Sequence, residues 1–112
     1  MVTPEELHTL ALALPEAHER PAWGRACFRV KDKIFASMSP DGVEVAVKVA
    51  EDERHALVAG DPDTFSVPPH YRNWSMVVIQ LATVEPDELR ELLTEAWRTT
   101  APKRLLAAFD AG

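Results

Sequence analysis

Apolar and polar residues alternate along residues 25–49, and this alternation predicts three consecutive antiparallel strands. In the first strand, Ala26, Phe28 and Val30 alternate with cationic residues and a cysteine, and in the third strand valine occupies every second position. A sheet of this kind buries one face and leaves the other open to solvent or to a ligand.

The second strand follows the same rule, because side chains in a strand point alternately to the two faces of the sheet. Ile34, Ala36 and Met38 are therefore predicted to lie on the buried face, with Phe35 and Ser37 on the opposite one. The Pro-Asp-Gly sequence that follows is a turn signal, since proline presets a backbone dihedral and glycine accepts a positive φ.

Apolar residues at helical spacing predict four helices around this meander. The first begins at the N-cap candidate Thr3 and is stopped by Pro15, the second spans residues 50–60, the third begins at Pro86, and the last follows Pro102. The third has the clearest apolar stripe, formed by Leu89, Leu92, Leu93, Ala96 and Trp97.

Three further segments connect these elements. Residues 16–24 are predicted to form an edge strand and then a turn at Trp23-Gly24, because Pro21 cannot donate a hydrogen bond inside a sheet. Residues 61–73, rich in Pro, Asp and His, are expected to form an ordered loop or short strand. Residues 74–81 have apolar side chains on both faces, which is typical of an inner strand.

The order of elements predicts an α+β fold, a two-layer sandwich in which helices pack on one face of an antiparallel, meander-rich sheet. Its 112 residues are expected to form a single domain, 1–112. Apolar runs such as residues 76–79 are far too short to span a membrane, and we expect no membrane partner. A single cysteine and the lack of an export signal indicate the cytoplasm.

Charge is unevenly distributed in this acidic chain, whose formal net charge is −6. Residues 20–33 contain five cations and one acid, a local charge of +4, whereas residues 51–63 contain five acids and one arginine, a local charge of −4. The basic segment predicts either an anion-binding surface or ordinary solvated charge on an outer strand face.

The sequence offers no support for enzymatic chemistry. Cys27 lies between two arginines that favour a thiolate, yet no His or acid is placed beside it, and a small half-exposed strand residue is the simpler interpretation. The four histidines lack metal-ligand spacing, and neither a serine nucleophile motif nor a phosphate-binding glycine loop is present. We therefore expect no enzyme activity, no cofactor and no metal.

Aromatic and cationic residues gather around the predicted sheet. Trp23, Tyr71 and Trp74 lie close in sequence to arginines and to His70, which are residue types that stack on planar ligands and contact phosphates. The alternative is that Trp74 fills the core and Trp23 covers a sheet edge, as large aromatic residues in small domains commonly do.

A series of short motifs resembles the MmcQ/YjbR family. The motifs are Glu16-x-His18, Pro21-x-Trp23-Gly24, Phe28-Arg29-Val30, Lys33-Ile34-Phe35-Ala36, Lys48, Pro68-Pro69-His70, Trp74, the leucine-rich helix at 89–93 and Ala101-Pro102-Lys103. The resemblance implies a fold like that of CyaY and the secretion chaperones. It also implies DNA binding through strand-and-loop wings, whereas a namesake from an antibiotic biosynthesis cluster implies drug binding or self-resistance.

The leading functional hypothesis is a non-enzymatic module, expected to be a monomer, that binds double-stranded DNA or another polyanion through a cationic sheet edge. The expected contact residues are Arg20, Trp23, Arg25, Arg29, Lys31, Lys33, Lys48, Arg72, Trp74 and Lys103.

Two other hypotheses remain open. One is a pocket between sheet and helices that holds a planar metabolite or drug, built on Trp23, Tyr71, Trp74 and Trp97. The other is a protein-interaction surface along an exposed sheet edge.

Overall fold

A computed structural model of the chain describes residues 1–71 and 73–111. Its elements, in chain order, are α1 (Pro4–Leu12), β1 (His18–Glu19), β2 (Ala26–Val30), β3 (Lys33–Met38), β4 (Glu44–Lys48), α2 (Glu51–Gly60), β5 (Phe65–Ser66), the 3-10 turn η1 (Pro69–Tyr71), β6 (Met76–Gln80), α3 (Pro86–Thr100) and α4 (Lys103–Ala111).

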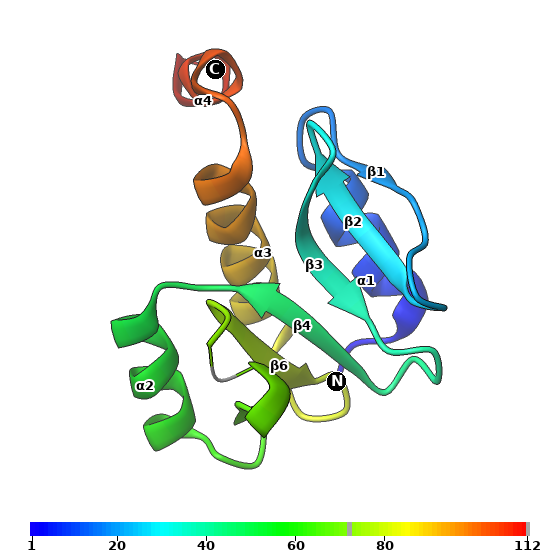
Figure 1. The fold of residues 1–112 in the computed structure, drawn as a ribbon, viewed down its shortest axis with the longest axis vertical. Helices are drawn as coiled ribbons and strands as arrows, with labels where there is room; N and C mark the ends of the chain where they lie inside the picture. Colours follow the sequence, from blue (N-terminus) through cyan, green and yellow to red (C-terminus); the bar gives the residue numbers. More distant parts are fainter. Residues whose placement is uncertain (72, 112) are drawn as a thin grey trace.

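The six strands form one antiparallel sheet in the order β1-β2-β3-β4-β6-β5. Helices α1 and α3 lie behind this sheet in Figure 1, while α2 lies beside its β6 side and α4 extends from the far end of α3. The α+β class, with an antiparallel sheet backed by helices, is confirmed.

The helix-backed face of the sheet is a filled hydrophobic core. The predicted stripe of α3 is buried against valines of β4 and β6, and α1 adds Leu7 and Ala11. Trp97 is 0% exposed, and its indole Nε1–H donates to the carbonyl oxygen of Pro15 at 2.9 Å. Large side chains of α3 thus occupy the space between the two layers.

Helix α1 begins as its sequence predicts but ends earlier. The Thr3 hydroxyl accepts from the backbone N–H of Glu6, and the Glu6 carboxylate accepts from the backbone N–H of Thr3, which completes the capping box. The last helical residue is Leu12, so the helix ends before it reaches Pro15.

A β-bulge in β3 makes the predicted faces of Ile34 and Phe35 wrong. Arg29 pairs with Ile34, but Phe28 pairs with Ala36, which leaves Phe35 as the extra residue on β3. Both Phe35 and Ala36 are fully buried in the core, whereas Ile34 moves to the opposite face. Strict alternation predicted the reverse for Phe35 and Ile34, because sequence periodicity does not register a bulge.

Candidate ligand-binding groove

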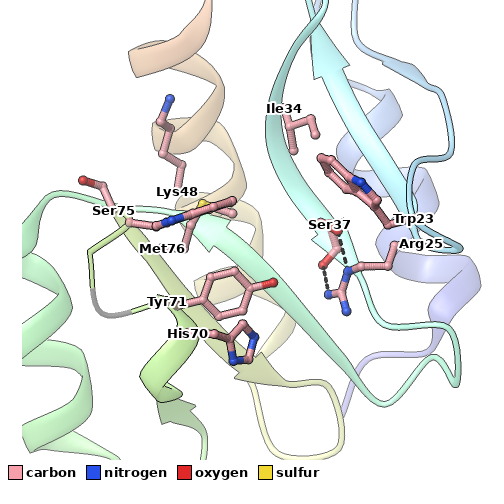
Figure 2. A pocket seen from close by; sticks show the side chains of 10 residues that line it. Trp23, Arg25, Ile34, Ser37, Lys48, His70, Tyr71, Ser75 and Met76 are labelled. Atoms are coloured by element: carbon pink, nitrogen blue, oxygen red, sulfur yellow. Dashed lines mark hydrogen bonds between the residues drawn. The ribbon is translucent and has the colours of Figure 1, made fainter.

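The face of the sheet that α1 and α3 do not cover carries a hollow of about 550 Å³, called here the sheet groove. Residues without large side chains pair in one row across five strands on this face, namely Cys27, Ser37, Ala46, Val78 and Ser66, and Ser37 of this row lines the groove. The lining residues are Trp23, Arg25, Ile34, Ser37, Lys48, His70, Tyr71, Trp74, Ser75 and Met76. In Figure 2 the side chains of Trp23, Arg25 and Ile34 stand on one side of the hollow, and those of His70, Tyr71 and Met76 stand on the other.

One wall of the sheet groove is the turn between β1 and β2. Ala22 and Arg25 pair through two backbone hydrogen bonds, so Trp23 and Gly24 form a two-residue hairpin turn. Their φ angles are 54° and 73°, as a type I′ turn requires. Trp23 is a rare residue at such a position, and its side chain is 83% exposed.

The opposite wall is the segment from η1 to the start of β6. The rings of His70 and Tyr71 lie 4.3 Å apart, and the Tyr71 ring meets that of Trp74 edge-on at 6.1 Å. Trp74 is 60% exposed although it belongs to this aromatic cluster. Four rings therefore line the groove, one on the hairpin wall and three on the η1–β6 wall.

A buried arginine of α2 fixes the η1–β6 wall. The Arg54 side chain donates from Nη1 to the carbonyl oxygens of Tyr71, Trp74 and Met76, at 3.3, 2.5 and 3.4 Å. Arg54 is 7% exposed, and charged donors to buried carbonyls form strong hydrogen bonds. Arg54 thus ties to α2 the backbone that carries the rings of Tyr71 and Trp74.

The charged groups of the sheet groove are cationic. The Arg25 guanidinium donates from Nε to the Ser37 hydroxyl at 2.8 Å and from Nη2 to the Ser37 carbonyl at 3.0 Å. Lys48 is half-buried, and its ammonium has no ion pair among residues 1–71 and 73–111. No Asp or Glu is among the lining residues.

The positive charge of Arg25 contributes to the lowered pKa of Asp41. The pKa of Asp41 is lowered chiefly by the hydrogen bond from the Ser39 hydroxyl, then by the Val43 backbone N–H, with a smaller contribution from the Arg25 charge. Its Oδ1 accepts from Ser39 at 2.6 Å and from Val43 at 3.1 Å, so this carboxylate serves the β3–β4 turn.

The predicted contact residues divide into separate groups. Trp23, Arg25, Lys48 and Trp74 line the sheet groove, Arg72 lies outside the described residues, and Lys103 lies on α4. The other four predicted residues gather near the β2–β3 turn; they are Arg20, Arg29, Lys31 and Lys33.

The cations near the β2–β3 turn have different partners. Arg20 lies 3.7 Å from an Asp32 carboxylate oxygen, and Arg29 donates to the backbone carbonyls of Arg20 and Asp32. Lys31 and Lys33 are exposed and form no ion pair within the described part of the chain. Within this group, Arg29 lies four positions along the chain from Arg25, which is roughly 13 Å at strand rise, and the Arg20 side chain lies against Asp32.

Two predictions about this region are wrong. The four aromatic residues expected to build a pocket between sheet and helices do not share one, because Trp97 is buried in the core whereas Trp23, Tyr71 and Trp74 line the other face of the sheet. Cys27, expected to be half-exposed, is 1% exposed, and its Sγ lies 3.6 Å from the Ser37 hydroxyl in the row beneath the groove.

Sequence reasoning missed several residues of the sheet groove. Alternation predicts only that Ser37, Ile34 and Met76 lie on strands, and Arg54, which supports the groove from behind its wall, is one charge in an acidic segment. Small residues at the outward positions of β2, β3 and β4 were a detectable sign of a hollowed face. The role of Arg54 left no local sign, since its partners lie at least 17 positions away.

The described residues, 1–71 and 73–111, contain neither a membrane-spanning helix nor a cluster of metal-ligating side chains. None of their helices is long and apolar enough to cross a membrane. In residues 1–71 and 73–111, no three His, Cys, Asp or Glu side chains come together in a way that would hold a metal ion.

Comparison with known proteins places this fold in a family. The family model described as YjbR matches residues 12–99. Uncharacterized protein Rv2570 of Mycobacterium tuberculosis is 40% identical over 76 residues, which are 67% of this chain and 59% of that protein. Uncharacterized protein Mb2600 of Mycobacterium bovis matches to the same extent. The chain thus spans less than two thirds of the length of these relatives.

A solved structure has the same architecture. The crystal structure of Deinococcus radiodurans protein DR2400, with the domain DUF419, gives a TM-score of 0.80 over 92% of this chain and 81% of that chain, at 22% identity. That likeness concerns the fold alone, whereas the family match extends from the end of α1 almost to the end of α3 and includes every residue of the groove. The chain therefore belongs to the YjbR family.

Proposed function

We propose that this protein is a non-enzymatic binding module whose sheet groove takes up a planar aromatic ligand. The observation that carries the proposal is the pair of exposed tryptophans, Trp23 and Trp74, that line one hollow from opposite walls. Exposed indoles on both sides of a groove provide two flat apolar surfaces for a ring placed between the walls.

The conformation of Trp23 supports this proposal. A non-glycine residue in the left-handed region costs roughly 1–2 kcal/mol, and Asn or Gly is the usual occupant of this turn position. Trp23 bears that cost while its side chain packs little against the rest of the molecule, since it is 83% exposed. Strain without a packing benefit is characteristic of a binding position.

Size and rigidity also support the proposal. Small-molecule sites usually measure about 300–1,000 Å³ and are lined mainly by apolar and aromatic groups. The sheet groove has a volume of about 550 Å³, and Arg54 and Ser37 hold groups on its two sides in place. Such a site binds with a small ordering cost.

Isothermal titration calorimetry with neutral and charged naphthalene, quinoline and acridine derivatives tests this function. Trp23→Ala and Trp74→Ala should each weaken binding at least fivefold, because stacking on an aromatic side chain contributes about 1–3 kcal/mol per ring. Val43→Ala, which trims an exposed apolar residue outside the lining, should leave affinity unchanged. Absence of binding across the panel, or full binding by the double tryptophan variant, contradicts the proposal.

A second candidate function is polyanion binding at the β2–β3 turn, favoured by Lys31 and Lys33. Both lysines are exposed, and Arg29 beside them donates to backbone carbonyls. Duplex DNA should then bind at ~50 mM salt with a log–log salt slope of about −3 to −5 for four or five phosphate contacts.

Fluorescence anisotropy of a labelled duplex measures this second function. Replacing both lysines by Gln should weaken binding equally for all duplex sequences, because such cations position DNA without reading bases. Arg90→Gln, which removes a cation on α3, is the matched control. Undetectable binding at ~50 mM salt excludes this candidate.

A further inference from the structure

We propose that the ligand of the sheet groove is an aromatic acid whose carboxylate binds the free edge of Arg25 while its ring lies against the tryptophans. This inference rests on the function proposed above and specifies the chemistry of the ligand. It depends on the way Ser37 holds Arg25 and on the sign of charge in the groove.

Arg25 is oriented before any ligand arrives. Its Nε and Nη2 donate to the hydroxyl and the carbonyl oxygen of Ser37, which occupies one of the two edges of the guanidinium that can form paired hydrogen bonds. The other edge, formed by Nη1 and the second hydrogen of Nη2, donates to no acceptor in residues 1–71 and 73–111. Paired N–H groups in this geometry match the two oxygens of a carboxylate.

Charge in the sheet groove selects an anion. Arg25 and Lys48 both line it, and none of its lining residues is an acid. The neighbouring Asp41 is already engaged by Ser39 and Val43, and Arg25 forms no ion pair of 4.0 Å or less within the described residues. A groove with two cations in a chain of net charge −6 is a local reversal of sign, which favours anionic over neutral ligands.

The Tyr71 hydroxyl, on the η1–β6 wall, is a second hydrogen-bond donor in the groove. In Figure 2 the Tyr71 ring reaches across the sheet with its hydroxyl directed toward Arg25 and Ser37, and the His70 ring lies against Tyr71. A phenol O–H can also donate one hydrogen bond to a carboxylate, beside the stronger charge-assisted pair from a guanidinium. Arg25 and Tyr71 thus form a polar end of the groove, while Ile34 and Met76 contribute apolar lining.

Arg25, and not Lys48, is assigned as the carboxylate receptor. Lys48 carries a flexible stem and a point charge with no fixed direction, whereas Arg25 is held by two hydrogen bonds. Replacing Lys48 should therefore lower the affinity for an aromatic acid only by removing a charge. Replacing Arg25 should also remove the preference for a carboxylate over other groups on the same ring.

Calorimetric titration of the full chain with matched naphthalene probes tests the inference. 2-Naphthoate should bind at least tenfold more tightly than 2-naphthamide, which has the same ring and a neutral group of similar shape. Arg25→Gln and Arg25→Lys should both reduce this ratio to below threefold, Lys48→Gln should reduce it less, and Arg90→Gln should leave it unchanged. Far-UV circular dichroism and a melting curve establish that each variant is folded.

The outcomes separate the two proposals. Equal affinity for naphthoate and naphthamide, with both lost in Trp23→Ala, overturns the carboxylate inference and leaves the aromatic groove in place. A ratio that survives in Arg25→Lys also overturns it, and so does tighter binding of 2-naphthyl phosphate or adenosine monophosphate than of 2-naphthoate. No binding of any probe overturns the function proposed for the groove itself.

Discussion

The two faces of the sheet use tryptophan in opposite ways. On the helix-backed face, Trp97 is fully buried and its indole N–H is bonded to Pro15; on the other face, Trp23 is 83% exposed in a left-handed turn conformation. The same strands supply large residues such as Phe28 and Phe35 to one face and smaller ones such as Cys27 and Ser37 to the other. One face therefore stabilises the fold, and the other carries the groove for which we propose a ligand.

The largest expected effect is on the buried side. Trp97→Ala should lower the free energy of unfolding by about 3–5 kcal/mol, because it leaves a large cavity between α3 and the sheet. Urea titration followed by circular dichroism measures the change. Trp97→Phe keeps most of the volume and loses the bond to Pro15, so its loss should be much smaller. Equal losses of unfolding free energy for Trp97→Ala and Trp23→Ala would contradict the difference drawn between the two faces.

Arg54→Met should have the next largest effect. It removes the charged donor shared by the carbonyls of Tyr71, Trp74 and Met76, and the carbonyls of Tyr71 and Trp74 then keep only a backbone N–H donor each. Because hydrogen bonds to charged groups contribute about 1.5–3 kcal/mol, stability should fall by roughly that amount. The same variant should weaken groove ligands, because the η1–β6 wall loses its anchor. Faster amide hydrogen exchange confined to residues 71–76 would locate the change. Uniform exchange across the sheet would argue against a local role.

Trp23→Asn should separate stability from binding. The variant creates an Asn-Gly pair, the preferred sequence of a type I′ turn, and relieves the strain of a tryptophan with a φ of 54°. Stability should stay equal or rise by up to about 1 kcal/mol, while affinity for aromatic ligands falls at least fivefold. A clear loss of stability would mean that Trp23 is a packing residue, as in the alternative drawn from the sequence.

The smallest effect concerns the ion pair that ties α4 to α3. Arg98 donates to both oxygens of Asp110 at 2.6 and 3.2 Å, and this hydrogen bond, more than its charge, lowers the pKa of Asp110 from its ordinary value of 3.8. A lowered carboxyl pKa stabilises the fold above the ordinary value, and that stabilisation is lost as pH falls through the folded-state pKa.

Asp110→Asn should therefore lower the melting temperature slightly at pH 7 and not at all at pH values below the folded-state pKa. Both partners are solvent-exposed, so the shift should also shrink in high salt. A shift that is the same at all pH values would show that the side chain acts through packing instead of charge.

Local patterns in the sequence were sufficient to predict most of the fold. Alternating valines predicted β4, the stripe from Leu89 to Trp97 predicted α3, and Trp23-Gly24 was predicted to form a turn; all three are observed. Each depends on neighbours a few positions apart. The bulge at Phe35 escaped prediction, because pairing between two strands creates it.

The candidate site, like the fold, could be predicted from the sequence only in part. The sequence indicated that Trp23, Arg25, Tyr71 and Trp74 belong to one group, yet it could not choose between a packing role and a binding role. It also assigned them a pocket on the helix side of the sheet. Whether these side chains have a packing role or a binding role depends on which face of the sheet each side chain reaches and on what covers that face.

The sequence alone determined the strands, the helices and the residue types available for binding, because hydrophobic periodicity and turn chemistry are properties of neighbouring residues. The tertiary structure decided where those residues meet. Only pairing across five strands brings Ser37 and its small neighbours into one row on the groove face, and only the packing of α2 brings Arg54 to the carbonyls of Tyr71, Trp74 and Met76. Concavity is a relation between distant segments, so the sheet groove exists only in the folded chain.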